Sequence, residues 1–144
     1  AARAAGEAIT QFVHLSLLEL AGRGTAMSQR EALRERIKQL VAARLGDPGL
    51  SVDGIAATLN CSRRHLYNAF SDEAEGVAGY ILRERLEACR RELLRPQRRS
   101  VTEIALAHGF ANLAHFSRVF KSRYGMPPRD YREHTRHLLG EATP

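Results

Sequence analysis

The chain has 144 residues, of which 44% are hydrophobic and 26% are charged, so its composition is that of an ordinary globular protein with room for one domain or two small ones. Its basic residues exceed its acidic residues and give a formal net charge of +6, which favours an anionic partner, usually nucleic acid and less often a membrane surface. Two cysteines are too few for a disulfide framework, and no apolar run reaches the roughly 18 residues of a membrane-spanning helix. The first residues also lack a signal-peptide pattern. We therefore expect the protein to reside in a reducing cytoplasm.

Residues 7–21 predict a helix with more apolar surface than one face can bury. Its main stripe, at 3.6-residue spacing, consists of Ile9, Phe12, Val13, Leu17 and Leu20. Two further leucines lie outside this stripe, so the helix needs burial on more than one side, either on the rest of this chain or on another chain or a missing domain. Residues 22–25 (GRGT) predict a linker. Because the chain lacks an initiator Met and begins within a pattern, we expect a fragment of a longer protein.

A second helix is predicted after this linker. Ser28 and Glu31 form a capping box, which predicts that the helix starts there. The core stripe of this helix consists of Leu33, Ile37, Leu40, Val41 and Leu45. Arginines and one lysine occupy the rest of its surface, and residues 46–49 (GDPG) predict its end.

Residues 51–71 predict two short helices joined by a tight turn. Ser51 caps the first helix, Asn60 and Cys61 form the turn, and Ser62 caps the second helix. The second helix buries one side and turns outward Arg63, Arg64, Tyr67, Asn68 and Ser71. A long helix is predicted next, over about 77–95, and Pro96 ends it. Its inner stripe consists of Leu82, Leu86, Cys89 and Leu93.

Residues 100–124 predict a second pair of short helices. Ser100 and Glu103 form a capping box, Gly109 turns the chain after the first helix, and Asn112 caps the second. The inner face of that second helix consists of Phe116, Val119, Phe120 and Tyr124. Its outer face is small, polar and basic, which suits a DNA major groove. On spacing and charge alone, a helical hairpin whose polar face meets only water is equally open. A last helix is predicted to begin at Pro128.

The two helix pairs are copies of one unit, which predicts an internal duplication. At a period of 49–50 residues, Val52, Ile55, Ala56, His65, Leu66 and Phe70 correspond to Val101, Ile104, Ala105, His115, Phe116 and Phe120. We therefore expect an all-α fold of two helix-turn-helix subdomains joined by a long linker helix. Because the two outer faces differ, a monomer that reads two successive major grooves would recognise an asymmetric site.

The segment IALAHGFANLAHFSRVFKSRYGMPPRDYR resembles the signature of the AraC/XylS family of bacterial transcription regulators. The matching residues are Ile104, Ala105, Gly109, Phe110, residues 115–121, Gly125, Pro128 and Tyr131. This resemblance implies sequence-specific binding of double-stranded DNA at promoters, often as an activator that touches RNA polymerase. It also implies that a small-molecule effector acts through an N-terminal domain that this chain lacks.

The resemblance suggests three parts. Residues 1–24 would be the C-terminal helix of the missing sensor and dimerisation domain, and residues 7–21 would then offer a dimer contact. Residues 28–95 would form the first helix-turn-helix subdomain with the linker helix, and residues 96–137 the second subdomain.

The resemblance also implies which residues meet DNA. Base contacts fall on Arg64, Tyr67, Asn68, Leu113, Ala114, His115, Ser117 and Arg118. Candidates for phosphate contact are Ser62, Arg63, Arg98, Arg99, Asn112, Lys121 and Arg123. The two arginines of the first set suit guanine O6 and N7, Asn68 suits adenine, and the apolar side chains suit a thymine methyl group. Phosphate contacts position the protein and carry no base information.

Simpler roles compete with several of these assignments. Arg98, Arg99 and Arg123 are also explained as solvated charges. His65 and His115 flank the core side of their helices, where packing or capping is the favoured role. The ring of Tyr67 could simply cover apolar surface. The acidic run at residues 72–75 would repel phosphate against DNA, so this turn is either reshaped or faces a protein.

Other function classes have weaker support in the sequence. There is no Gly-rich phosphate loop, no placeable Ser, His and acid set and no pair of carboxylates in an apolar setting, so we expect no enzyme, no cofactor and no metal site. Few exposed aromatic residues are available to stack the bases of single-stranded RNA. The remaining alternative is a helical protein-interaction module without specific DNA readout, which would dock through the N-terminal helix and the acidic loop.

Overall fold

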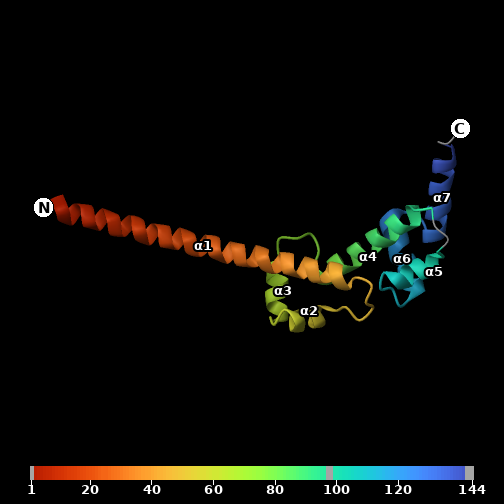
Figure 1. Cartoon of the computed structure of the whole chain (residues 1–144), viewed down its shortest axis with the longest axis horizontal. Coiled ribbons are helices and arrows are strands. Elements are labelled where there is room, and N and C mark those ends of the chain that lie inside the picture. The colour runs from red at the N-terminus through yellow and green to blue at the C-terminus, as the bar shows by residue number, and fades with distance from the viewer. Residues whose placement is uncertain (1, 97–98, 142–144) are drawn as a thin grey trace.

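A computed structural model describes residues 2–96 and 99–141, and within residues 2–5, 19–27 and 141 it describes the backbone alone. The described residues form helices and no strands, which confirms the expected all-α fold (Figure 1). The helices are α1 (Ala2–Arg44), α2 (Val52–Thr58), α3 (Arg63–Ala69), α4 (Val77–Leu94), α5 (Val101–Ala107), α6 (Leu113–Tyr124) and α7 (Pro128–Glu141). The chain is longest along α1, whose N-terminal part extends away from all other helices (Figure 1).

The predicted linker at residues 22–25 is wrong, because α1 runs through it as one helix of 43 residues. The capping box at Ser28 is therefore wrong too, since this residue lies inside the helix rather than at its start. Glycine favours a break without imposing one: each interior Gly costs about 1 kcal/mol relative to Ala, and no Pro is present to remove a hydrogen bond. The pair Ser28 and Glu31 has the spacing of a capping box, but the residues before Ser28 are helical too, so no helix starts there.

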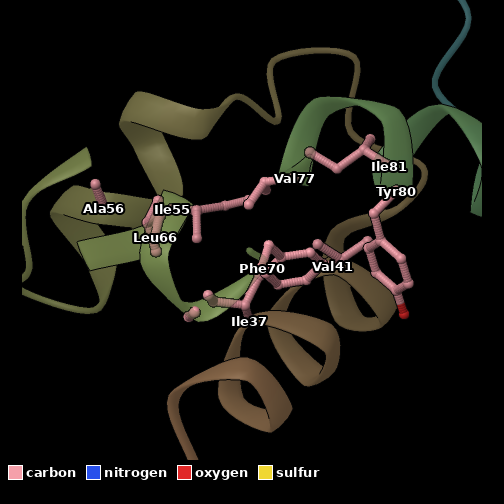
Figure 2. Packing of buried hydrophobic residues seen from close by; sticks show 10 residues of the cluster. Ile37, Val41, Ile55, Ala56, Leu66, Phe70, Val77, Tyr80 and Ile81 are labelled. Carbon is pink, nitrogen blue, oxygen red and sulfur yellow. The ribbon is translucent and has the colours of Figure 1, made fainter. Parts of the chain in front are cut away.

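The first hydrophobic core joins the C-terminal part of α1 to α2, α3 and the first turns of α4 (Figure 2). Ile37 from α1, Ile55 from α2 and Leu66 from α3 are fully buried in it. Phe70 and Tyr80 close one end of this core, with ring centroids 5.5 Å apart in an edge-to-face arrangement. The core stripe expected for residues 28–45 is therefore confirmed: Ile37 and Val41 are buried, and Leu33, Leu40 and Leu45 are partly buried against them.

The second hydrophobic core joins the C-terminal half of α4 to α5, α6 and α7. Its buried residues are Leu86, Cys89, Leu93, Ile104, Ala105, Phe110, Phe116 and Phe120. Partly buried Val119, Tyr124 and Tyr131 pack against them, so the predicted inner face of α6 is confirmed and Tyr131 anchors α7. This core is rich in aromatic rings, which bury large apolar areas in a small unit.

Helix α4 belongs to both units, because its buried residues divide between the two cores. Val77, Tyr80 and Ile81 belong to the first core, and Leu86, Cys89 and Leu93 belong to the second. The cores therefore separate inside α4, between Ile81 and Leu86, and α4 ends at Leu94, close to the expected residue 95. With 18 residues, α4 spans about 27 Å. The two cores are therefore connected by a continuous helix.

Cys89 gives a direct test of the second core. Its side chain is 0% exposed, and burial raises the pKa of its thiol to about 12, whereas Cys61 is only half-buried. Because the thiolate is the reactive form, we expect iodoacetamide at pH 7.5 to modify Cys61 in the folded chain and to modify Cys89 only after unfolding in guanidinium. Mass spectrometry of the two peptides measures this, and equal labelling rates under native conditions would contradict the burial of Cys89.

Candidate nucleic-acid interface

The turn between α5 and α6 has the geometry that the sequence predicts. Ser100 and Glu103 make both hydrogen bonds of the capping box at the start of α5. Gly109 follows α5 with a φ of +89°, in the left-handed region that favours glycine. Asn112 then caps α6, since its Oδ1 accepts a hydrogen bond from the backbone N–H of His115 at 3.0 Å. These local contacts fix the direction in which α6 leaves the turn.

Helix α6 presents a polar and basic face to solvent. Phe116 and Phe120 are buried on its inner side, while the side chains predicted to meet bases are exposed. These exposed residues are Leu113, Ala114, His115, Ser117 and Arg118. Arg118 makes no hydrogen bond or ion pair with any residue that the structure describes, so its guanidinium is available to a ligand. The predicted set therefore lies together on one accessible face.

The first unit repeats this arrangement, with capped helices α2 and α3 joined by a short turn. Ser51 caps α2 at 3.0 Å from the N–H of Gly54, and Ser62 caps α3 at 3.2 Å from the N–H of His65. Asn60 makes the turn between them with a φ of +53°, which Asn tolerates better than most residues. On α3 the predicted base-contact residues Arg64, Tyr67 and Asn68 are all exposed.

Some of the side chains predicted to contact phosphate already interact with other described residues of the chain, and others do not. Arg63 forms an ion pair with Asp53 at 3.1 Å, and Arg99 forms one with Glu92 at 2.8 Å. The guanidinium of Arg123 lies 5.8 Å from the ring centre of Tyr124, as in a cation–π contact. Lys121 is exposed and has no partner among the described residues, whereas Arg98 lies outside them. Ser62 and Asn112 already cap helices, so the structure leaves Lys121 the most available of this set.

The two histidines do not flank the core as expected. His65 and His115 are both exposed, so packing is excluded for their rings. Their backbone N–H groups donate to the capping side chains of Ser62 and Asn112, and the Nδ1 of His65 lies 2.9 Å from the Ser62 hydroxyl. Packing is therefore wrong for both rings, whereas the contact of the His65 ring with the N-cap Ser62 agrees with the expected capping role.

The acidic run after α3 lies against α1. Asp72 is 3.5 Å from Arg34, and Glu73 is 2.9 Å from Lys38. The hydrogen bond from Lys38 lowers the pKa of Glu73, although burial opposes that shift. The negative charge of this loop is therefore paired within the first unit, so it is compatible with binding of α3 to DNA.

Sequence reasoning missed the role of the basic side chains on α1. Arg30 donates to the carbonyl oxygen of Asn68 at 3.0 Å, and Arg34 donates to that of Ala69 at 2.8 Å. These carbonyls belong to the last turn of α3, where a helix lacks internal partners for them. The spacing of Arg30, Arg34 and Lys38 at every fourth residue puts them on one face of α1 and was the signal available in the sequence.

A partly buried set of hydrogen bonds, called a tie below, also connects α4 to α6. The carboxylate of Glu87 accepts hydrogen bonds from Arg90 at 3.0 Å and from the Tyr124 hydroxyl at 2.7 Å. These two bonds, that from Arg90 foremost, lower the pKa of Glu87, and burial together with the bond to Glu87 raises the pKa of Tyr124 to about 12. The recognition helix candidate α6 is thereby fixed to the shared helix α4.

This tie predicts part of the acid sensitivity of the fold. Because folding depresses the pKa of Glu87, its stabilising contribution is complete above the unfolded value of about 4.3 and is lost as pH falls through the folded value. We expect Glu87→Gln to cost on the order of 1 kcal/mol at pH 7 and to flatten the fall in melting temperature below about pH 4.3. Glu133→Gln, at an exposed glutamate on α7, is the control. Identical acid profiles for Glu87→Gln and the wild type would contradict this role.

The described residues hold no cluster of three or more His, Cys, Asp or Glu side chains arranged to bind a metal. In the same part of the chain, no helix combines the length and the apolar character needed to cross a membrane. The arrangement that remains is a pair of capped, outward-facing helices, α3 and α6, on two small cores that share α4.

Known proteins resemble this chain over most of its length. Residues 55–134 match a family described as helix-turn-helix domain, and residues 29–79 match one described as homeodomain-like domain. The chain is 34% identical over 102 residues to the transcriptional activator NphR of Rhodococcus sp, which covers 70% of this chain and 30% of NphR. It is 34% identical over 87 residues to the probable transcription factor PqrA of Proteus vulgaris, which covers 59% of this chain and 70% of PqrA.

A solved structure has the same arrangement of helices. The crystal structure of a transcriptional regulator from Chromobacterium violaceum, described as an AraC-type DNA-binding domain-containing protein, is 30% identical to this chain. The two superpose with a TM-score of 0.65 over 76% of this chain and 96% of that one. The chain spans about a third of the length of several curated relatives that it matches.

Proposed function

The chain belongs to the AraC/XylS family of bacterial transcription regulators, and on that premise we propose that it inserts α3 and α6 into two successive major grooves of an asymmetric promoter site. The family assignment makes it a DNA-binding regulator domain and not an enzyme. Double-stranded DNA is its partner. The proposal adds which helices enter the grooves, how many of them do so, and which side chains read the bases.

The observation that carries this proposal is the pair of free arginines. Arg64 on α3 and Arg118 on α6 are exposed and make no hydrogen bond or ion pair with the described residues. A guanidinium in a major groove forms two hydrogen bonds to guanine, and each such pair discriminates by about 1–3 kcal/mol. Their neighbours differ, since α3 exposes Tyr67 and Asn68 beside Arg64, and α6 exposes Ala114 and Ser117 beside Arg118. Because α3 and α6 expose different side chains, they support recognition of two different base sequences in the bound DNA.

Control by an effector, contact with RNA polymerase and dimerisation are proposed for the intact protein. Helix α1 supports a further protein contact, because its exposed side chains include Ile9, Phe12 and Leu15, which are 65%, 72% and 61% exposed. Apolar side chains gathered on one helix favour burial against a partner. We place a dimer contact or the rest of a sensor domain on residues 7–21, and we place the whole protein in the cytoplasm. A protein-interaction role for this segment accompanies DNA binding and does not replace it.

The experiment that tests this function is selection of bound duplexes from a random DNA pool by this chain at near-physiological salt. We expect enrichment of an asymmetric site with two unlike blocks whose centres lie about 10–10.5 base pairs apart. Enrichment of one short block would leave a single reading unit and contradict the two-groove proposal. Binding without enrichment that fades as salt rises would reduce the interaction to attraction between a basic surface and phosphate.

A further inference from the structure

The two units touch at a second place besides α4, where backbone meets backbone. The loop after α1 lies beside the turn between α5 and α6 (Figure 1). A Cβ added to Gly46 would stand 2.7 Å from the carbonyl oxygen of Ala107, and one added to Gly109 would stand 2.7 Å from that of Leu45. Both distances are shorter than any side chain tolerates. Each glycine therefore makes room for the main chain of the other unit.

Arg85 completes this contact from the middle of α4. Its Nε donates to the carbonyl oxygen of Leu45 at 3.1 Å, and its Nη2 donates to that of Asp47 at 2.6 Å. A Cβ on Gly109 would also meet the Nε of Arg85 at 2.7 Å, so the guanidinium lies between the loop of the first unit and the turn of the second. Burial lowers the pKa of Arg85, as expected for a side chain enclosed between two segments.

The contact lies at the edge of a shared hollow and outside the two hydrophobic cores. Beside the contact lies a hollow whose apolar lining comes from both units, namely Pro48, Leu50, Val52, Ile81, Leu82 and Phe110. Arg85, Gly46 and Gly109 belong to neither hydrophobic core. A single shared helix can bend, but a second attachment, through residues 38–40 positions away in the chain, opposes such bending.

We propose that Arg85, Gly46 and Gly109 form a clasp that fixes α3 relative to α6 and thereby sets the spacing between the two DNA blocks that the protein accepts. This inference rests on the proposed two-groove reading. Arg85 acts as a positioning residue, because it touches backbone and no base. Each base pair inserted between the blocks rotates the second groove by roughly 35°, so a rigid pair of units must reject wrong spacings and a loosened pair accepts them.

The test measures binding of selected DNA sites whose blocks are separated by the selected spacing or by one base pair more or fewer. For the wild-type chain we expect wrong spacings to weaken binding at least about tenfold. Arg85→Ala is expected to reduce that ratio to about threefold or less while each block alone is bound as before. Gly46→Ala is a second variant with the same expected effect: its backbone is not in the left-handed region, so Ala causes no backbone strain, but the added methyl group must push the loop and Ala107 apart.

Two matched controls separate the clasp from general effects. Arg91→Ala removes an exposed arginine from the same helix, and Gly76→Ala adds a methyl group where no atom lies within 4 Å. Both should keep the wild-type dependence on spacing, and circular dichroism verifies that every variant is folded. If Arg85→Ala and Gly46→Ala are folded and keep the full dependence, the clasp does not set the spacing. If the wild type shows no dependence itself, the two-groove proposal fails first and the clasp fails with it.

Discussion

Phe120→Ala is expected to lower the free energy of unfolding by about 3–5 kcal/mol. The side chain is 0% exposed, and its ring centre lies 5.7 Å from Phe116, 4.6 Å from Tyr124 and 5.5 Å from Tyr131. Truncation leaves a cavity among three rings that the surrounding helices cannot close. Urea unfolding followed by circular dichroism measures the change.

Phe12→Ala is the matched control for this substitution. It is the same chemical change at a side chain that is 72% exposed on α1, so we expect a change within about 0.5 kcal/mol. A loss below about 1 kcal/mol for Phe120→Ala would show that the aromatic cluster does not hold the second unit together. Loss of that cluster would also release α7 from α6, because Tyr131 of α7 packs on Phe120 of α6.

Arg118→Ala is expected to weaken binding to a selected site by about 1–3 kcal/mol, roughly 5- to 150-fold, and to relax the preference at one base position. The side chain is exposed on α6 and has no partner among the described residues, so its removal leaves the fold intact. Binding to random duplexes should change much less. Fluorescence anisotropy with the selected site, its single-base variants and a random duplex measures all three quantities.

Lys121→Ala provides the comparison on the same helix. If Lys121 contacts phosphate, its loss should weaken binding to selected and random duplexes alike. The slope of log K against log salt concentration should fall in magnitude by about one. An equal loss on both kinds of DNA for Arg118→Ala would instead assign Arg118 to phosphate. The same pair of measurements on Arg64→Ala examines the first unit, whose acidic loop forms ion pairs with α1.

The local features of this fold could be read from the sequence because their causes lie within four residues. Ser51, Ser62, Ser100 and Asn112 each cap a helix through the backbone N–H three residues further on. The turn at Gly109 is equally local. The inner faces of the helices follow from 3.6-residue periodicity, and they locate both cores. The outward faces of α3 and α6, which form the candidate site, then follow as their complement.

The features that the sequence did not reveal depend on contacts between distant residues. Arg34 meets Ala69 and Asp72 across more than 30 residues, and Arg85 meets Leu45 across 40. Their side chains look like solvated charges in the sequence, since nothing local distinguishes a paired arginine from a free one. The linker predicted at residues 22–25 failed for a related reason: glycine lowers helix stability by an amount that the flanking helix can offset.

Methylation interference at guanine N7 on the selected site tests the central claim most directly, because N7 lies in the major groove. If α3 and α6 enter successive grooves, methylation should block binding in two clusters about 10–10.5 base pairs apart, and Arg64→Ala and Arg118→Ala should each remove the interference of one cluster. Interference confined to one cluster, or unchanged by both substitutions, would contradict reading of two grooves by these two helices.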